Sequence, residues 1–171
     1  MTDLSHARRT AGQPGPEHSA RQAAEADLGG ILELERVGFA DADQWSEDSW
    51  RSELTEPSLQ VMIIGTDRPL GVIALRTAGD SVELDRIVVR PDARRQGLAR
   101  RLINTALGKI EADGAEEMIL EVWSGNAAAI ALYRSFGFIE LITRRDYYGP
   151  GRDAVIMKLS LQDHRAEEGR T

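Results

Sequence analysis

One carboxylate interrupts the apolar run at residues 118–123 (MILEVW), a run that predicts a β-strand. Side-chain alternation places Glu121 on the face opposite Leu120 and Val122. Glu121 is then either a solvated residue near a strand end or a partly desolvated carboxylate that can accept a proton as a general base. The spacing alone leaves both interpretations open.

A helix is predicted directly after this strand, over residues 127–136. Asn126 is a favourable N-cap and Gly137 a favourable terminator of that helix. Asn126 and Tyr133 are two helical turns apart and therefore share a face. Taken by themselves, the two residues are an ordinary cap and an ordinary core aromatic.

An anion-binding turn is predicted within residues 88–101, which pass from a strand through a turn into a helix. Free backbone N–H groups and the positive end of the helix dipole favour phosphate at such a position. Gly97 and the small Ala99 would let a phosphate approach the backbone closely. Four cations crowd the same helix start: Arg94, Arg95, Arg100 and Arg101. Each should cost about 0.3–1 kcal/mol against the dipole, a conflict that a bound anion removes. An exposed basic turn is the alternative.

The elements that position these residues can be predicted from hydrophobic periodicity and turn signals. The predicted helices are 27–37, a short one starting near Ser46, and 98–112. The predicted strands are 59–64, 71–76, 82–90, 118–123, 138–143 and 154–161. The first three strands predict an antiparallel meander, and the later alternation of strands and helices predicts an α/β fold with a sheet of mixed direction.

Length and composition indicate one globular domain, because a single core serves roughly 100–200 residues. The polar ends at 1–20 and 162–171 are predicted to be flexible tails around a domain at 21–161. There is no run long enough for a membrane span and no secretory signal at the N-terminus, so a cytoplasmic location without membrane contact is expected.

Several kinds of chemistry are excluded by the residues that are absent or misplaced. The chain has no cysteine, which excludes a thiol nucleophile, disulfides and cysteine-based zinc sites, and no metal is expected. The three histidines, His6, His18 and His164, lie in the predicted tails, which makes a histidine-centred triad improbable. A formal net charge of −7 argues against nucleic-acid binding and favours a basic peptide as partner.

The chain resembles the GNAT superfamily of acyl-CoA-dependent N-acetyltransferases. Arg94, Gly97 and Ala99 occupy the fixed positions of the family signature Arg/Gln-x-x-Gly-x-Gly/Ala, after a strand and at a helix start. The string LEVWSGNAAAIALYRSFGF, which begins at Leu120, is similar to the bacterial branch that acetylates the N-terminal alanine of a small-subunit ribosomal protein. The resemblance is close over residues 82–161 and weaker over 23–50.

This resemblance implies a GNAT fold: a mixed, mostly antiparallel twisted sheet flanked by helices, with acetyl-CoA between two central strands. It implies that Glu121 is the general base, Tyr133 the general acid and Asn126 a contact to the co-substrate. It further implies that three strand residues line the acetyl and pantetheine arm: Ile87, Val88 and Val89. The implied pyrophosphate cradle consists of Arg94, Arg95, Gln96, Gly97, Leu98, Ala99 and Arg100.

The implied reaction is a direct transfer from acetyl-CoA to the N-terminal amine of a ribosomal protein. Gln44 stands where the family commonly has proline, in a predicted substrate loop, and Ala99 replaces the second glycine. Two alternatives therefore remain. The acceptor could be another protein N-terminus, a lysine or a small amine, or the protein could be a non-catalytic sensor of acetyl-CoA.

Overall fold

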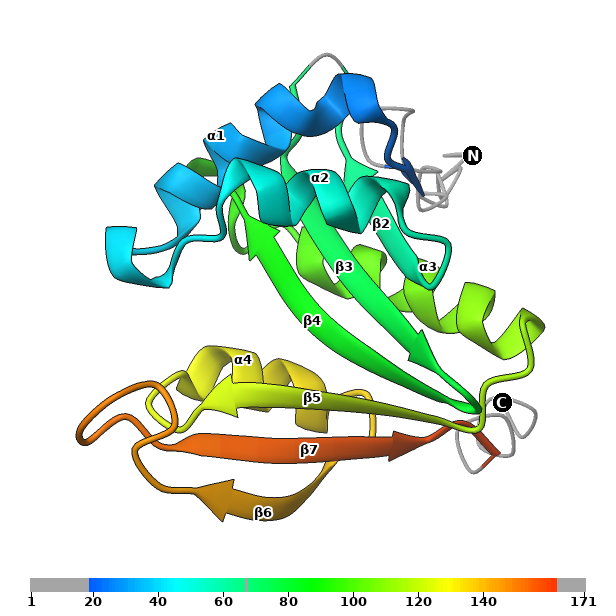
Figure 1. Cartoon of the computed structure of the whole chain (residues 1–171). Coiled ribbons are helices and arrows are strands. Elements are labelled where there is room, and N and C mark those ends of the chain that lie inside the picture. Colours follow the sequence, from blue (N-terminus) through cyan, green and yellow to red (C-terminus); the bar gives the residue numbers. More distant parts are fainter. Residues whose placement is uncertain (1–18, 67, 163–171) are drawn as a thin grey trace, which may run out of the picture.

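The computed structural model describes residues 19–66 and 68–162, and Figure 1 shows the arrangement of their helices and strands. The strands are β1 (Ala20–Gln22), β2 (Leu59–Ile64), β3 (Gly71–Ala78), β4 (Ser81–Val89), β5 (Glu117–Trp123), β6 (Ile139–Arg144) and β7 (Ala154–Ser160). The helices are α1 (Leu28–Gly38), α2 (Glu47–Thr55), α3 (Leu98–Ala112) and α4 (Ala127–Arg134). Short 3-10 turns occur at η2 (Glu25–Asp27), η3 (Asp41–Asp43) and η4 (Pro91–Ala93).

The described strands form one sheet in the order β1-β2-β3-β4-β5-β7-β6. Every neighbouring pair is antiparallel except β4 and β5, which run parallel. The parallel register covers only Ser81–Leu84 against Glu117–Leu120, and the two strands then diverge (Figure 1). Beyond Leu84 and Leu120 the two central strands no longer pair, so the sheet is open between them from that point on.

A β-bulge in β4 lies where this divergence begins. Ala74 of β3 pairs with Arg86 while Leu75 pairs with Leu84, so Asp85 is the additional residue. A bulge twists a strand and changes the face on which the following side chains lie, and bulges are frequent beside active sites.

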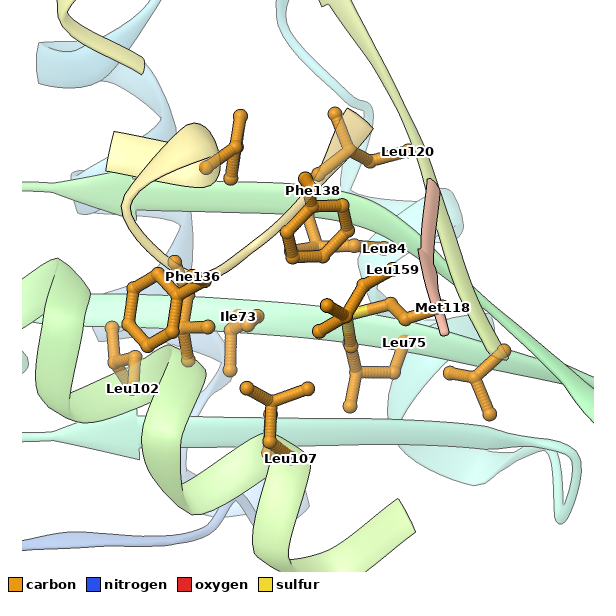
Figure 2. Close-up of a cluster of buried hydrophobic side chains, with 14 of the residues drawn as sticks. Ile73, Leu75, Leu84, Leu102, Leu107, Met118, Leu120, Phe136, Phe138 and Leu159 are labelled. Atoms are coloured by element: carbon orange, nitrogen blue, oxygen red, sulfur yellow. The ribbon is translucent and has the colours of Figure 1, made fainter. Parts of the chain in front are cut away.

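The side chains between the layers form two hydrophobic clusters. The larger one lies between the sheet and helices α3 and α4, and Figure 2 shows Leu102 and Leu107 of α3 converging with Met118 of β5 and Phe138. The smaller cluster lies on the opposite face, between α1 and α2 and strands β2 to β4, with Leu34 and Trp50 fully buried. We call these the back cluster and the front cluster.

The predicted α/β fold and the antiparallel meander β2–β3–β4 are confirmed. Helix α4 ends at Arg134, two residues before the predicted end, because Gly137 adopts a left-handed φ of 90° and the N–H of Phe138 bonds back to the carbonyl of Tyr133. Strand β1 was not predicted, since its polar sequence ARQ is a strand only through pairing with β2.

The predicted tails lie outside the described residues except for residues 19, 20 and 162, and Ala20 is the first residue of β1. Within the described ranges, no helix has the length and apolar character needed to cross a membrane.

Candidate active site

The start of α3 has the geometry of an anion site. Gly97 is the N-cap residue with a left-handed φ of 77°, and Arg95 also has a positive φ, of 64°. A Cβ at Gly97 would meet no atom within 4 Å, so space is open in front of the turn. The backbone N–H groups of residues 97–100 donate to no acceptor in the described part of the chain. Four free donors at the positive end of a 15-residue helix can bind a phosphate without rearrangement.

The residues of the predicted cradle have different roles in the structure. Arg95 and Gln96 are exposed, whereas Leu98 is buried in the back cluster, so only its backbone faces the turn. Arg94 donates from Nε to the carbonyl of Val89 at 3.2 Å. Arg100 donates from Nη2 to Ser135 Oγ at 2.7 Å, and its guanidinium lies 4.9 Å from the ring of Phe136. Arg94 and Arg100 therefore hold β4 and the end of α4 against the turn, and Arg95 is exposed two residues before Gly97.

The predicted acetyl-arm strand, Ile87 to Val89, lies beyond the bulge, where β4 has a neighbour on one side only. These residues pair with Gly71 to Ile73 of β3, but the ladder to β5 has already ended at Leu84. Val88 packs into the front cluster, and Ile87 and Val89 pack against the back cluster. On the β5 side of this segment the carbonyl of Val89 accepts from Arg94, and a ligand that lies between the strands could pair with the remaining backbone groups.

Glu121 lies on β5 one residue past the last β4–β5 pair, as the alternation predicts: Leu120 and Val122 are buried on the opposite face. Its side chain is 31% exposed and accepts a hydrogen bond from Arg144 Nη1 at 2.8 Å. The side chain is partly buried, as the second interpretation has it, but the sequence did not predict its ion pair. The carboxylate is paired with a cation from β6, a neighbour that only the tertiary structure provides.

Two adjacent tyrosines that follow β6 were not predicted as individual site residues. A hydrogen bond to Glu121 raises the pKa of Tyr147. Tyr148 is half-buried, and its burial, with Glu121 and Tyr147 nearby, raises its pKa to about 12. The sequence shows a polar loop with Gly149 and Pro150 here, and no local signal indicates that the loop folds back over β5.

The bulge in β4 places two further charged residues beside the site, Asp85 near Glu121 and Arg86 near Tyr148. Asp85 is bonded to Arg76 Nε at 3.0 Å, and burial raises the pKa of the Asp85 carboxyl, with Glu83 and Glu121 adding to the effect. Arg86 forms a 2.6 Å ion pair with the buried Glu35. The guanidinium of Arg86 also lies 3.9 Å from the ring of Phe39 and 4.6 Å from that of Trp45. These contacts fix α1 and the segment after it against β4.

Tyr133 and Asn126 occupy the places that their local sequence predicts. Asn126 Oδ1 accepts from the N–H of Ala129 at 3.2 Å, which confirms the cap. Tyr133 is 4% exposed, its ring centroid is 5.7 Å from that of Phe138, and burial raises the pKa of its phenol. Tyr148 interacts electrostatically with both Tyr133 and Glu121. Tyr148 thus links the two groups that the sequence analysis singled out.

A mixed sheet opens between two parallel central strands, with free N–H groups at the helix start that follows β4 and a carboxylate on β5, which is the arrangement expected of an acyltransferase. A sequence model of the Acetyltransferase (GNAT) family matches residues 27–138, and the chain belongs to this family. The expected GNAT fold is therefore confirmed.

The similarity extends to particular enzymes. The ribosomal protein bS18-alanine N-acetyltransferase of Salmonella typhimurium strain LT2 is 37% identical over 125 residues, which cover 71% of this chain and 84% of that protein. The crystal structure of the ribosomal-protein-S18-alanine N-acetyltransferase from Escherichia coli superposes with a TM-score of 0.76 at 32% identity, covering 84% of this chain and 93% of that one. The structure of the NatC complex bound to Gag peptide and CoA has a TM-score of 0.70 at 22% identity, covering 83% and 98%, and shows a shared fold only.

Proposed function

We propose that this chain transfers the acetyl group of acetyl-CoA to the N-terminal alanine amine of a ribosomal protein. The membership in the GNAT family and the names of the similar enzymes support the reaction and the class of acceptor. One observation carries the proposal: Glu121 lies where β4 and β5 separate, and β4 continues from that point into the turn that ends in the free N–H groups at the start of α3. A proton acceptor and an anion site therefore border the same opening.

Acetyl-CoA fits the residues on the β4 side of this opening. The free N–H groups of 97–100 and the exposed Arg95 would hold the pyrophosphate, in the space that the missing side chain of Gly97 leaves. The unpaired edge of Ile87 to Val89 would line the pantetheine arm and the acetyl group, and Asn126 would contact the co-substrate from the start of α4.

Glu121 would act as the general base. It takes a proton from the α-ammonium group of the acceptor, through a water molecule, and Arg144 orients the carboxylate during this step. The neutral amine then attacks the thioester carbonyl directly. A backbone N–H near Val89, on the edge of β4 that lacks a strand neighbour, stabilises the oxyanion of the tetrahedral intermediate.

Tyr133 would be the general acid. The hydroxyl keeps its proton throughout the neutral range and would donate it to the departing CoA thiolate, although burial raises the pKa of the phenol and makes it a weaker acid.

The test is to incubate the protein with acetyl-CoA and purified ribosomal proteins and to identify the acetylated peptide by mass spectrometry. We expect modification of one alanine N-terminus, and a peptide with that sequence should exceed free lysine and polyamines in kcat/KM. Equal kcat/KM for all three acceptors would assign the protein to general amine acetylation. Tight acetyl-CoA binding without turnover of any acceptor would identify a sensor instead.

A further inference from the structure

An ion pair joins the two sides of the opening between β4 and β5. Arg152, in the connection between β6 and β7, contacts Asp43 of η3, 109 residues earlier in the sequence. Nη1 donates to Oδ1 at 3.1 Å and Nη2 to Oδ2 at 2.9 Å. Two parallel bonds of this kind fix the orientation as well as the distance of the partners. We call this pair the clasp.

The Asp43 side of the clasp is rigidly anchored. The carbonyl of Asp43 accepts a hydrogen bond from Arg86 Nη2 at 2.5 Å, and Arg86 is buried in its ion pair with Glu35. The N–H of Asp43 donates to the carbonyl of Ala40 at 2.8 Å. This wall of the opening is therefore part of the packed structure around β4.

The Arg152 side belongs to a loop, residues 145–153, whose internal contacts are local. The N–H of Tyr148 donates to the carbonyl of Arg152 at 3.0 Å, and the N–H of Arg152 to the carbonyl of Gly149 at 2.9 Å. The guanidinium of Arg152 also lies 5.6 Å from the ring of Trp123 and 5.9 Å from that of Tyr148. Arg152 is thus the point at which the loop, β5 and η3 meet.

This loop carries the tyrosines that face the catalytic carboxylate. Tyr147 is hydrogen-bonded to Glu121, and Tyr148 interacts with both Glu121 and Tyr133. Glu121 therefore lies beside the loop that Arg152 joins to Asp43.

We propose that the Asp43–Arg152 clasp positions the 145–153 loop, and with it Tyr148, for binding of the acceptor amine, so that it sets acceptor affinity but not acetyl-CoA affinity. Arg152 and Asp43 are positioning residues, and the inference rests on the proposed acetyl transfer to a peptide amine. Their side chains are 39% and 32% exposed, and an ion pair this exposed adds little to global stability. Its loss should release the loop and leave the fold intact.

The experiment compares Arg152→Gln, Asp43→Asn and the double variant with the wild-type enzyme, using an alanine-starting peptide as acceptor. Each single variant should raise the peptide KM about tenfold with the acetyl-CoA KM within about twofold, since a loosened loop weakens orientation of one substrate only. The double variant should match the singles, because both remove one interaction. Arg152→Lys keeps the charge but not the paired geometry, so its peptide KM should lie between those of the wild type and Arg152→Gln.

Arg21→Gln is the matched control, because Arg21 forms a similar two-bonded pair with Asp27, at 2.8 Å for both bonds, at the opposite end of the sheet. It should leave both KM values unchanged. Additive effects in the double variant, or an equal rise in the acetyl-CoA KM, would overturn the proposal.

Amide hydrogen exchange, measured without substrate, tests the clasp independently of the proposed reaction. Residues 145–153 should exchange faster in Arg152→Gln and Asp43→Asn but not in Arg21→Gln. Unchanged exchange in the loop would show that the pair does not position it. If the wild-type protein acetylates no peptide while loop exchange still rises in both variants, the acetyl-transfer proposal fails and the clasp itself stands.

Discussion

The two parts of the sheet are covered differently. Strands β2 to β4 have helices on both faces, α1 and α2 on one and α3 on the other (Figure 1). Strands β5 and β7 share the back cluster with α3 and α4, whereas the residues of β6 are exposed. The front cluster of the described residues contains no side chain from these three strands. On the front face, Trp123 is 43% and Ile142 60% exposed, and Glu121 lies in the same row as Ile142.

We infer that the packed part of the sheet provides most of the stability and that the open part carries the proposed catalytic group. The closed N-terminal part holds the front cluster and the start of α3, whereas the open C-terminal face carries Glu121, the proposed base. Loops and open faces next to a packed scaffold are where binding residues are usually found. The following substitutions test that division, from the largest expected effect to the smallest.

Glu121→Gln should lower kcat by roughly 10²–10⁴ with little change in acetyl-CoA affinity, because it removes the base and preserves the shape. Rising pH should restore part of the rate, since an acceptor α-amine with a pKa of about 8 then loses its proton without help. Glu117→Gln, on the same strand but bonded to Lys158 and Ser81, is the control and should remain active. If the Glu121→Gln enzyme were as active as wild type at neutral pH, the general base would not be on the open face.

Leu34→Ala should destabilise the fold by about 2–5 kcal/mol, because Leu34 is fully buried in the front cluster and the change leaves a cavity. Ile142→Ala, on the open face, should change the free energy of unfolding by less than about 0.5 kcal/mol. Urea denaturation measures both values. Similar losses of unfolding free energy in the two variants would mean that the front face is packed equally well in both parts of the sheet.

Gly97→Trp should weaken acetyl-CoA binding by about 100-fold or more, since the indole would fill the space in front of the free N–H groups of α3. Gly114→Trp is the control: Gly114 also has a positive φ, of 88°, and open space beside it, but lies beyond the other end of α3. Isothermal titration calorimetry should therefore show a loss of affinity in the first variant only. Unchanged affinity in a folded Gly97→Trp protein would sink the assignment of the cradle.

Tyr133→Phe should lower kcat by about tenfold, the smallest of these effects, because ring packing against Phe138 is kept and only thiolate departure is impaired. Because the pKa of Tyr133 is raised, its phenol is protonated in the folded and in the unfolded chain up to a pH of about 10. Any stability that this group contributes is lost only as the pH rises further. The wild-type pH–rate profile should show no titration of Tyr133 below that pH.

The Tyr133→Phe defect should shrink at high pH, where CoA leaves as a thiolate without assistance. Full activity of Tyr133→Phe at neutral pH would make Tyr133 a packing residue. A parallel Tyr148→Phe variant would then show whether the proton comes from the phenol on the loop or from water.

Local sequence signals predicted most of the fold and part of the site. The capping residues Ser46 and Asn126 and the left-handed Gly137 place helix ends through interactions within a few residues, and these could be read directly. The turn around Gly97 was equally predictable, because a helix start binds anions through its own backbone. The same holds for the alternation that puts Glu121 on its face of β5.

By itself, then, the sequence determined the order of the elements, the faces of the strands, the glycine turn at the start of α3 and, through resemblance, the family. Only the tertiary structure decided that Arg144 pairs with Glu121, that the bulge at Asp85 coincides with the end of the β4–β5 ladder, and that Arg152 meets Asp43. The physical reason is separation along the chain: hydrogen bonds and caps within one turn leave a local pattern, whereas contacts between residues far apart depend on how the whole sheet twists and packs.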